Sequence, residues 1–278
     1  MPPAAVLIGT PYDPEARYSA KRSTHWTGDK VQRTETCDDD TLPMLTDVTT
    51  TPAPTADNTV AATIQARLAE RGLLPRTHLA DAGYVTADRL VTSGTEHGGN
   101  LLGPIHEDHR WQARANAGFA QADFALDGNA ERATCPQGKV GMEWKPAADS
   151  AGRAVVRTRF APADRGPCPA RAPCNASTRA RMVPIRPQNE ALIAARQRQH
   201  TAVLKGEYRC RAGIEGTIAQ GVGLGDLRRT RYRRLAKTRL PRLLIITALN
   251  FVRLVAWLAE RPRTQSRVSA FGKLATAT

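Results

Sequence analysis

Two acidic residues have neighbours that suit catalysis. Asp81 ends a short apolar stretch, Thr77–Asp81, which predicts a buried strand with a glycine turn two residues later. A carboxylate at the carboxyl end of a strand is a common position for catalytic groups in α/β proteins. Glu215 lies four residues after Arg211, so a helix would place both on one face. The carboxylate could then bind a metal ion while the guanidinium contacts a phosphate. The alternatives are an ordinary turn aspartate and a surface salt bridge.

A basic run follows the Glu215 segment closely. The chain has 278 residues with 40 Lys and Arg against 26 Asp and Glu, a net charge of +14. Residues 205–263 alone contain 14 basic and 4 acidic residues, a net of +10. Such an excess favours a polyanionic partner, and we expect contact with DNA phosphates. A solvated basic surface is the alternative. The residues concerned are Arg228, Arg229, Arg231, Arg233, Arg234 and Lys237.

The pattern of secondary structure indicates an α/β fold. We predict a loop-like segment over Pro2–Lys30, then strands and helices in the order strand, strand, helix, strand, helix, strand. Their predicted bounds are Val31–Thr36, Met44–Thr50, Asp57–Arg71 with Asp57 as N-cap, Thr77–Asp81, Ala87–Thr92 and Asn100–Pro104.

The rest of the chain divides by composition. Residues 1–104 would form one part of the core, and residues 105–187, rich in Gly, Pro and Cys, an inserted β-rich subdomain with a strand at Ala154–Phe160. Residues 188–260 return to helix, with Glu190–Gly221 and a long amphipathic or buried helix over Leu235–Glu260 that Pro241 should kink or begin. Residues 261–278 would be a loose basic tail. The apolar run Leu243–Ala259 is too short to cross a bilayer and predicts a buried helix.

The five cysteines point to a reducing compartment. Their number is odd and the first residues carry no secretion signal, so we expect a cytoplasmic protein without a membrane partner. Cys37 and Cys210 have no ligand-like spacing and read as packing residues. Cys135, Cys168 and Cys174 all fall in the predicted β-rich subdomain.

Taken together, these segments resemble a known family. HLADAGYVTADRLV around Asp81 and YRCRAGIEGTIAQGVGLGDLRRTRYRRLAKT from Tyr208 resemble the DDE transposases of bacterial insertion sequences, in the group with a Tyr-Arg-Glu signature. The signature positions would be Tyr208, Arg211 and Glu215. Weaker matches run along nearly the whole chain: Thr10–Arg17 resembles SPYDPEAR, Gly28–Thr36 resembles GYKVH-TET, and Gly103-Pro104, Trp111-Gln112, Cys135–Gly138 and Ala248–Leu258 also fit.

The resemblance implies a fold and an activity. The fold would be an RNase H-like (retroviral-integrase-like) core, a mixed sheet with helices and a β-rich insertion before the helix with the glutamate. Two aspartates and one glutamate would hold two Mg²⁺ ions for cutting and joining DNA strands at transposon ends and target. Asp81 would be the second acid and Glu215 the third, with Tyr208, Arg211 and the basic run on DNA. The protein would act near the bacterial nucleoid and could form a homo-oligomer.

The sequence also departs from the family pattern. The first acid lies on the first core strand, upstream of the match that contains Asp13, so this chain is expected to lack that acid, its strand and the usual N-terminal DNA-binding region. Asp29 stands in place of Tyr, Gln32 in place of His, Val222 in place of Lys and Pro241 in place of Gln. We therefore expect an N-terminally truncated, partly degenerate transposase that is inactive as this fragment. The alternative is a non-catalytic DNA-binding remnant that interferes with an intact transposase.

The resemblance also suggests a zinc site. Similar proteins have a further cysteine where Arg165 stands, which would complete a four-cysteine site with Cys135, Cys168 and Cys174. Three cysteines remain here. Zinc binding by these three and reduced, partly buried thiols are both open interpretations.

Overall fold

A computed structural model describes residues 3–21, 23–38, 41–149, 152–175 and 181–261. The chain divides into two compact units, Met1–Thr55 with Cys210–Thr278 and Ala56–Arg209. The predicted boundaries at residues 104 and 187 both fall inside the second unit. The predicted basic tail lies outside the described residues from residue 262 onward.

The first unit contains an antiparallel sheet in the order β1-β2-β3. Its strands are β1 (Arg17–Lys21), β2 (Thr24–Glu35) and β3 (Leu45–Pro52). The two strands predicted from their Val and Thr content are confirmed. The loop predicted over Pro2–Lys30 is wrong, because β1 and the start of β2 form a hairpin there. This hairpin has no apolar alternation, and a cross-strand pair holds it: Tyr18 stacks on His25 with ring centroids 6.1 Å apart.

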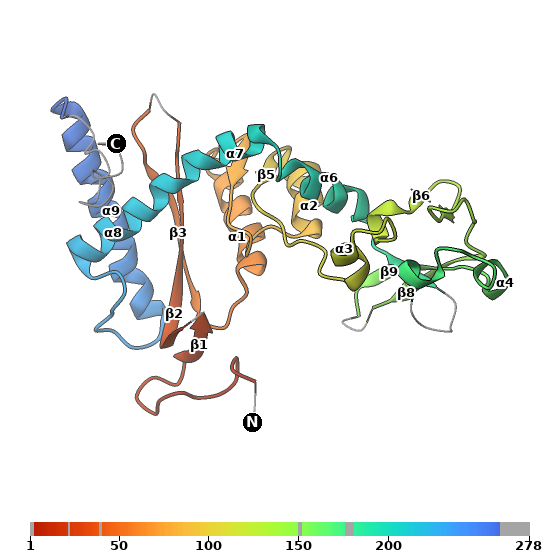
Figure 1. Cartoon of the computed structure of the whole chain (residues 1–278). Helices are drawn as coiled ribbons and strands as arrows, with labels where there is room; N and C mark the ends of the chain where they lie inside the picture. The colour runs from red at the N-terminus through yellow and green to blue at the C-terminus, as the bar shows by residue number, and fades with distance from the viewer. Residues whose placement is uncertain (1–2, 22, 39–40, 150–151, 176–180, 262–278) are drawn as a thin grey trace, which may run out of the picture. The chain divides into compact units, whose positions relative to one another are not determined.

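Two helices pack beside this sheet, α8 (Gly213–Gly225) and α9 (Leu235–Leu258), and Figure 1 shows both next to β3. Ile246 and Leu249 of α9 form an apolar cluster with Leu45 of β3. The side-chain amide of Asn250 also accepts a hydrogen bond from the backbone N–H of Leu45 and donates one to its carbonyl, both at 2.9 Å. Asn250 therefore pairs with the end of β3 as a neighbouring strand would.

The contact between α8 and α9 depends on glycine. A Cβ added at Gly225 would lie 2.5 Å from a side-chain carbon of Ile245, and one at Gly221 would lie 3.6 Å from a side-chain carbon of Leu249. A larger residue at Gly225 would push α8 away from α9, since 2.5 Å is far inside van der Waals contact. The two helices are close because α8 is smooth on this face.

Buried ion pairs connect α9 to β2. Arg253 donates to Glu35 across 2.8 Å, and the side chains are only 13% and 9% exposed. The Thr217 hydroxyl of α8 donates to the other carboxylate oxygen of Glu35 at 2.6 Å. Arg242 pairs with Asp29 at 3.3 Å, with both side chains 8% exposed. Burial lowers the pKa of the Arg242 guanidinium, and the charge of Asp29 opposes that shift.

Helix α9 is amphipathic, so the first of its two predicted forms is confirmed and the buried helix predicted for Leu243–Ala259 is wrong. Its buried residues are Thr238, Arg242, Ile246 and Leu249, which occupy one side of the helix. The helix is longer than the predicted apolar run and includes Pro241 in its second turn. By length and composition it is the described helix that could cross a membrane, with 24 residues and a mean hydropathy of 1.5.

The second unit contains a parallel strand pair between helices. Strands β4 (Thr77–Leu79) and β5 (Asn100–Leu102) pair in parallel, both shorter than predicted. Helix α1 (Asp57–Glu70) contacts α2 (Ala87–His97), which in turn contacts α6 (Asn189–Arg198); α7 (Ala202–Tyr208) follows. The N-cap of α1 is Ala56, not the predicted Asp57. The core residues are Val60, Ile64, Leu68, Val85, Leu101, Ile105 and Ala195.

The predicted β-rich region of this unit consists of short strands around one apolar cluster. The strands β10, β9 and β8 form one antiparallel sheet, and β6 pairs with β7. Phe124, Phe160 and Val183 lie in the cluster between them. The strand predicted at Ala154–Phe160 is confirmed as β9. The elements are α3 (Trp111–Ala115), η1 (Gln121–Asp123), β6 (Ala125–Asp127), β7 (Arg132–Thr134), β8 (Glu143–Ala148), β9 (Ala154–Arg159), α4 (Pro162–Arg165), α5 (Arg171–Cys174) and β10 (Met182–Ile185).

The sheets differ from the single mixed sheet that the resemblance implies. Among the described residues, β1, β2 and β3 pair antiparallel, and β4 and β5 pair parallel in a separate sheet. No described strand pairs with both. The α/β class is therefore as predicted, whereas one continuous mixed sheet is not observed.

We predict that Arg253→Met lowers the free energy of unfolding by about 3 kcal/mol, because Glu35 then keeps a buried charge without its ionic partner. Urea denaturation gives the magnitude, and amide hydrogen exchange in α9 shows where stability is reduced. Lys139→Met is the matched control, since Lys139 and Asp164 form an exposed pair at 3.5 Å. That control should change stability by less than about 0.5 kcal/mol. Equal effects in both variants would contradict the role given to Glu35.

Candidate active site and basic surface

Asp81 lies just beyond the carboxyl end of β4. The backbone N–H of Ala80 donates to the carbonyl of Leu102 at 2.8 Å, so the pairing with β5 continues to the residue before Asp81. Gly103 makes this approach feasible, because a Cβ there would overlap the carbonyl oxygen of Ala80. The turn that follows is closed by the N–H of Tyr84, which donates to the Asp81 carbonyl at 2.9 Å. The chain thus holds the Asp81 backbone on both sides.

Tyr208 is a neighbour of Asp81. The phenol hydroxyl donates to Oδ1 of the carboxylate at 3.3 Å, across 127 residues of sequence. Tyr208 is the last residue of α7, which begins at the N-cap Thr201. The sequence resemblance places Tyr208 on DNA, and the structure adds a contact with the predicted second acid. Both residues lie in the second unit.

Glu215 is in the first turn of α8 and is exposed. A single α-helix does not carry both Arg211 and Glu215, and their shared face stays a prediction. Helix α7 ends at Tyr208, a 3-10 turn η2 covers Arg209–Ala212, and α8 begins at Gly213. Arg211 and Glu215 therefore belong to different elements. The orientation of α8 follows from Thr217, whose buried hydroxyl is held by Glu35.

The two predicted acids belong to different units. Asp81 is part of Ala56–Arg209, and Glu215 is part of Cys210–Thr278. Their convergence on one metal site stays a prediction. Among the described residues, no group of three or more His, Cys, Asp or Glu side chains is gathered where it could hold a metal ion.

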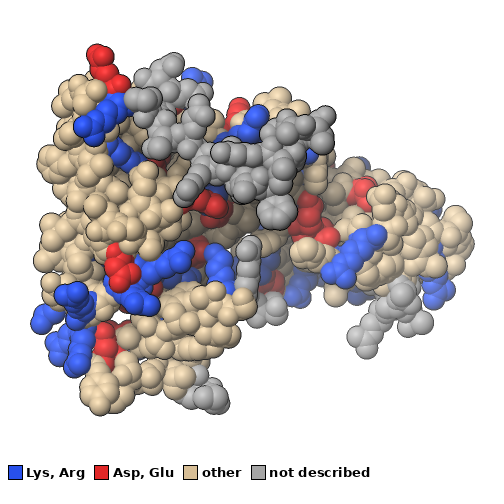
Figure 2. All heavy atoms as spheres, turned by 60° about the vertical axis from the view of Figure 1, so that its left-hand side comes forward, with Lys and Arg blue, Asp and Glu red and all other residues tan. Residues whose placement is uncertain are grey.

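The predicted basic run forms the loop between α8 and the first turn of α9, and its side chains are exposed. They belong to Arg228, Arg229, Arg231, Arg233, Arg234 and Lys237. Leu227 is buried and anchors the start of the loop. Arg233 lies over the ring of Tyr12 with 5.4 Å to the centroid. In Figure 2, blue Lys and Arg atoms gather at the lower left of the view, with red carboxylates among them.

Two carboxylates from the N-terminal segment cap α9 beside this loop. The N–H of Arg234 donates to Asp13 at 2.9 Å, and the N–H of Leu235 donates to Glu15 at 2.8 Å. Negative charge at a helix N-terminus is favourable, because the first N–H groups have no partner within the helix. This role was not visible in the sequence, since the caps lie about 220 residues from the helix that they serve.

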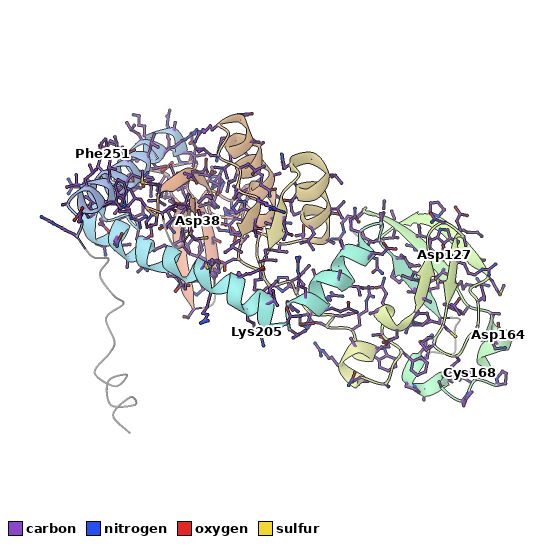
Figure 3. All side chains as sticks on the ribbon, turned by 90° about the horizontal axis from the view of Figure 1, so that it is seen from above. Asp38, Asp127, Asp164, Cys168, Lys205 and Phe251 are labelled. Carbon is purple, nitrogen blue, oxygen red and sulfur yellow. The ribbon has the colours of Figure 1, made fainter. Side chains whose placement is uncertain are left out.

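The three cysteines of the predicted zinc site lie in the second unit. Cys135 and Cys174 pack against the apolar cluster of the β-rich region. The Cys135–Gly138 segment is a tight turn, with the N–H of Gly138 donating to the Cys135 carbonyl at 2.8 Å. Cys168 is labelled in Figure 3 near Asp164. The absence of a three-ligand group among the described residues gives the zinc interpretation no support, and zinc binding stays a prediction.

Comparison with known proteins gives one result for part of the chain. Residues 134–255 match the family model described as "Transposase DDE domain", which implies an RNase H-like core and polynucleotidyl transfer by homology. No curated protein and no solved structure matches the chain at a significant level. The predicted resemblance to DDE transposases is thus confirmed over a range that includes Tyr208, Glu215 and the basic loop, whereas the Tyr-Arg-Glu group and the truncation stay predictions. Asp81 lies outside the matched range.

We predict that Asp13→Ala lowers the free energy of unfolding by about 1 kcal/mol, because the N–H of Arg234 loses its acceptor and the helix end loses a favourable charge. Asp13→Asn should have a smaller effect, since the amide oxygen can still accept. Urea denaturation of the two variants in parallel measures both. If Ala and Asn behave alike and as wild type, Asp13 does not cap α9.

Proposed function

We propose that this chain is part of an insertion-sequence transposase of the Tyr-Arg-Glu signature group and acts on double-stranded DNA. The observation that carries the proposal is the match of residues 134–255 to the DDE transposase domain, which includes both Glu215 and the exposed basic loop. The hydrogen bond between Tyr208 and Asp81 supports the proposal independently of the sequence match, because it links a signature residue to the predicted second acid. Its location would be the bacterial cytoplasm, at the nucleoid.

The donor set fits a divalent metal. Asp81 and Glu215 supply carboxylate oxygens, the ligands that Mg²⁺ prefers, and they would share the ion with a third acid of the family. A bound Mg²⁺ would stabilise charge on the reacting phosphate. In this chain, Tyr208 would hold the Asp81 carboxylate in one orientation by donating its hydroxyl. The exposed guanidinium groups of Arg228 and its neighbours would bind the phosphates on either side.

We also propose that these 278 residues lack activity by themselves. The resemblance places the first acid before the match that contains Asp13. Two carboxylates hold two metal ions poorly, so cleavage should need the third.

We predict that the basic loop accounts for most DNA binding. Replacing Arg228, Arg229, Arg231 and Arg233 with Ser should weaken binding at low salt. The slope of log K against log salt concentration should also fall by about 0.9 for each DNA phosphate that the variant no longer neutralises. Fluorescence anisotropy with a labelled duplex at several salt concentrations measures both quantities.

The matched control carries four other exposed arginines changed to Ser, so its net charge is equal. These are Arg76, Arg114, Arg132 and Arg159, all in the second unit. The control should keep the salt slope of the wild type. Equal slopes in the two quadruple variants would show that net charge, and not this loop, sets DNA binding.

Metal binding separates a transposase fragment from a non-catalytic remnant. We predict that Mn²⁺ binding, followed by electron paramagnetic resonance, weakens at least about tenfold in Asp81→Asn and in Glu215→Gln, since each removes a charged ligand. Glu207→Gln, on the exposed side of α7, should leave it unchanged. Wild-type affinity in all three variants would favour the remnant. Mg²⁺-dependent cleavage of a transposon end by wild type, abolished in Asp81→Ala, would overturn the predicted inactivity.

A further inference from the structure

Helix α9 presents a long apolar face to solvent. The buried side chains of α9 all point to β3, β2 and α8, and the opposite side of the helix is exposed. Phe251 is 63% exposed, Leu258 67% and Trp257 59%; Phe251 is labelled in Figure 3. The full set of large exposed apolar residues on the helix is Leu240, Leu243, Leu244, Phe251, Val252, Val255, Trp257 and Leu258.

Four of these side chains follow a heptad spacing. Leu240, Leu244, Thr247, Phe251 and Leu258 fall on one seam, with the half-buried Leu254 between the last two. Alternating steps of four and three residues form the seam through which two helices pack side by side. The hydroxyl of Thr247, in the middle of the seam, donates to the carbonyl of Leu243 at 3.0 Å. It can therefore be covered without losing a hydrogen bond.

The size of this face fits a small protein–protein interface. Six of the eight side chains lie within about 60° of the seam, and Val252 and Trp257 lie farther round the helix. Each of the six would remove on the order of 100 Å² from water, roughly 600 Å² per partner, which is the lower end for a specific interface. That area also matches the upper end of the largest apolar patch on an ordinary monomer, about 300–600 Å², and such patches often serve in binding.

The ion pairs of the opposite face argue against a lipid bilayer. Arg242 and Arg253 hold α9 on β2 through Asp29 and Glu35. Insertion across a membrane would break both buried pairs and move four charges into hydrocarbon, which costs several kcal/mol for each ion.

We propose that α9 is a dimerisation helix that packs antiparallel against α9 of a second copy of this chain, around a two-fold axis near Thr247. The charges on the helix favour that direction. It contains no acidic residue, and its exposed cations, Lys237 and Arg239, are both near its N-terminus. Parallel packing would bring these cations together. Antiparallel packing places them beside the second copy's C-terminal carbonyls and Glu260, which completes the charge complementarity.

The mass of the full 278-residue chain in solution tests the proposal. Light scattering coupled to size exclusion, over a range of micromolar concentrations, should give twice the 30.2 kDa of the monomer. Leu244→Glu with Phe251→Glu should give the monomer mass, because two charges then face the seam. Val203→Glu is the control, since Val203 is 70% exposed on α7, and it should stay dimeric. A monomeric wild type, or a dimer that survives both seam substitutions, overturns the proposal.

Cross-linking tests the direction. Cys37 and Cys210 are exposed and not packing residues as predicted. In a chain with both changed to Ser, Thr247→Cys should form a disulfide-linked dimer on oxidation. Leu258→Cys should form none, because antiparallel packing separates the two copies of residue 258 by about 30 Å. Efficient linkage at residue 258 would overturn the antiparallel arrangement. Flotation with anionic lipid vesicles is the last arm, and wild-type protein that floats with them as a monomer would overturn the dimer.

Discussion

The carboxylate of Glu35 is the contact on which the first unit depends. It lies near the end of β2 and receives hydrogen bonds from Arg253 of α9 and Thr217 of α8, so one buried charge joins three elements. The two helices flank parts of the proposed activity. Helix α8 begins with the turn that holds Glu215, and the loop between the two helices contains the basic run. A buried charge is stable only with its partners in place, so this arrangement fixes the geometry of both helices together.

The departures from the family pattern have a physical counterpart at Asp29. The resemblance expects a tyrosine there, and this chain has a carboxylate paired with a buried arginine, Arg242. The hydroxyl of Thr238 also donates to Asp29 at 2.9 Å. A position that departs from the family is thus a well-bonded part of this fold. The substitution alone is therefore no sign of a decayed protein.

Much of the fold could be predicted from local sequence. The apolar spacing of Val60, Ile64 and Leu68 predicted α1, and Val and Thr content predicted β2 and β3. Local patterns failed to predict features that depend on contacts with residues far away in the sequence. An apolar run does not say which side of a helix meets the sheet, so α9 was taken as buried. The hairpin around Tyr18 has no apolar alternation, and its pairing is formed by side chains on two strands.

Some features of the candidate site could likewise be predicted from local sequence, and others could not. Residue type and spacing indicated Asp81, Glu215 and the basic loop, because chemistry limits which residues can serve. The contact of Tyr208 with Asp81 and the caps formed by Asp13 and Glu15 join residues more than a hundred positions apart. No periodicity in the sequence contains that information. The break between α7 and α8 was also missed, although Gly213 directly after it is a weak helix former.

Asn250 pairs with backbone groups of β3 that the hydrogen bonds between β2 and β3 leave open. The outer side of a terminal strand exposes N–H and carbonyl groups in a row, which invites strands of other molecules to add to it and so promotes aggregation. The amide of Asn250 occupies both groups of Leu45, at the end of that row. A polar residue within an apolar helix therefore blocks the addition of a further strand at this end of the sheet.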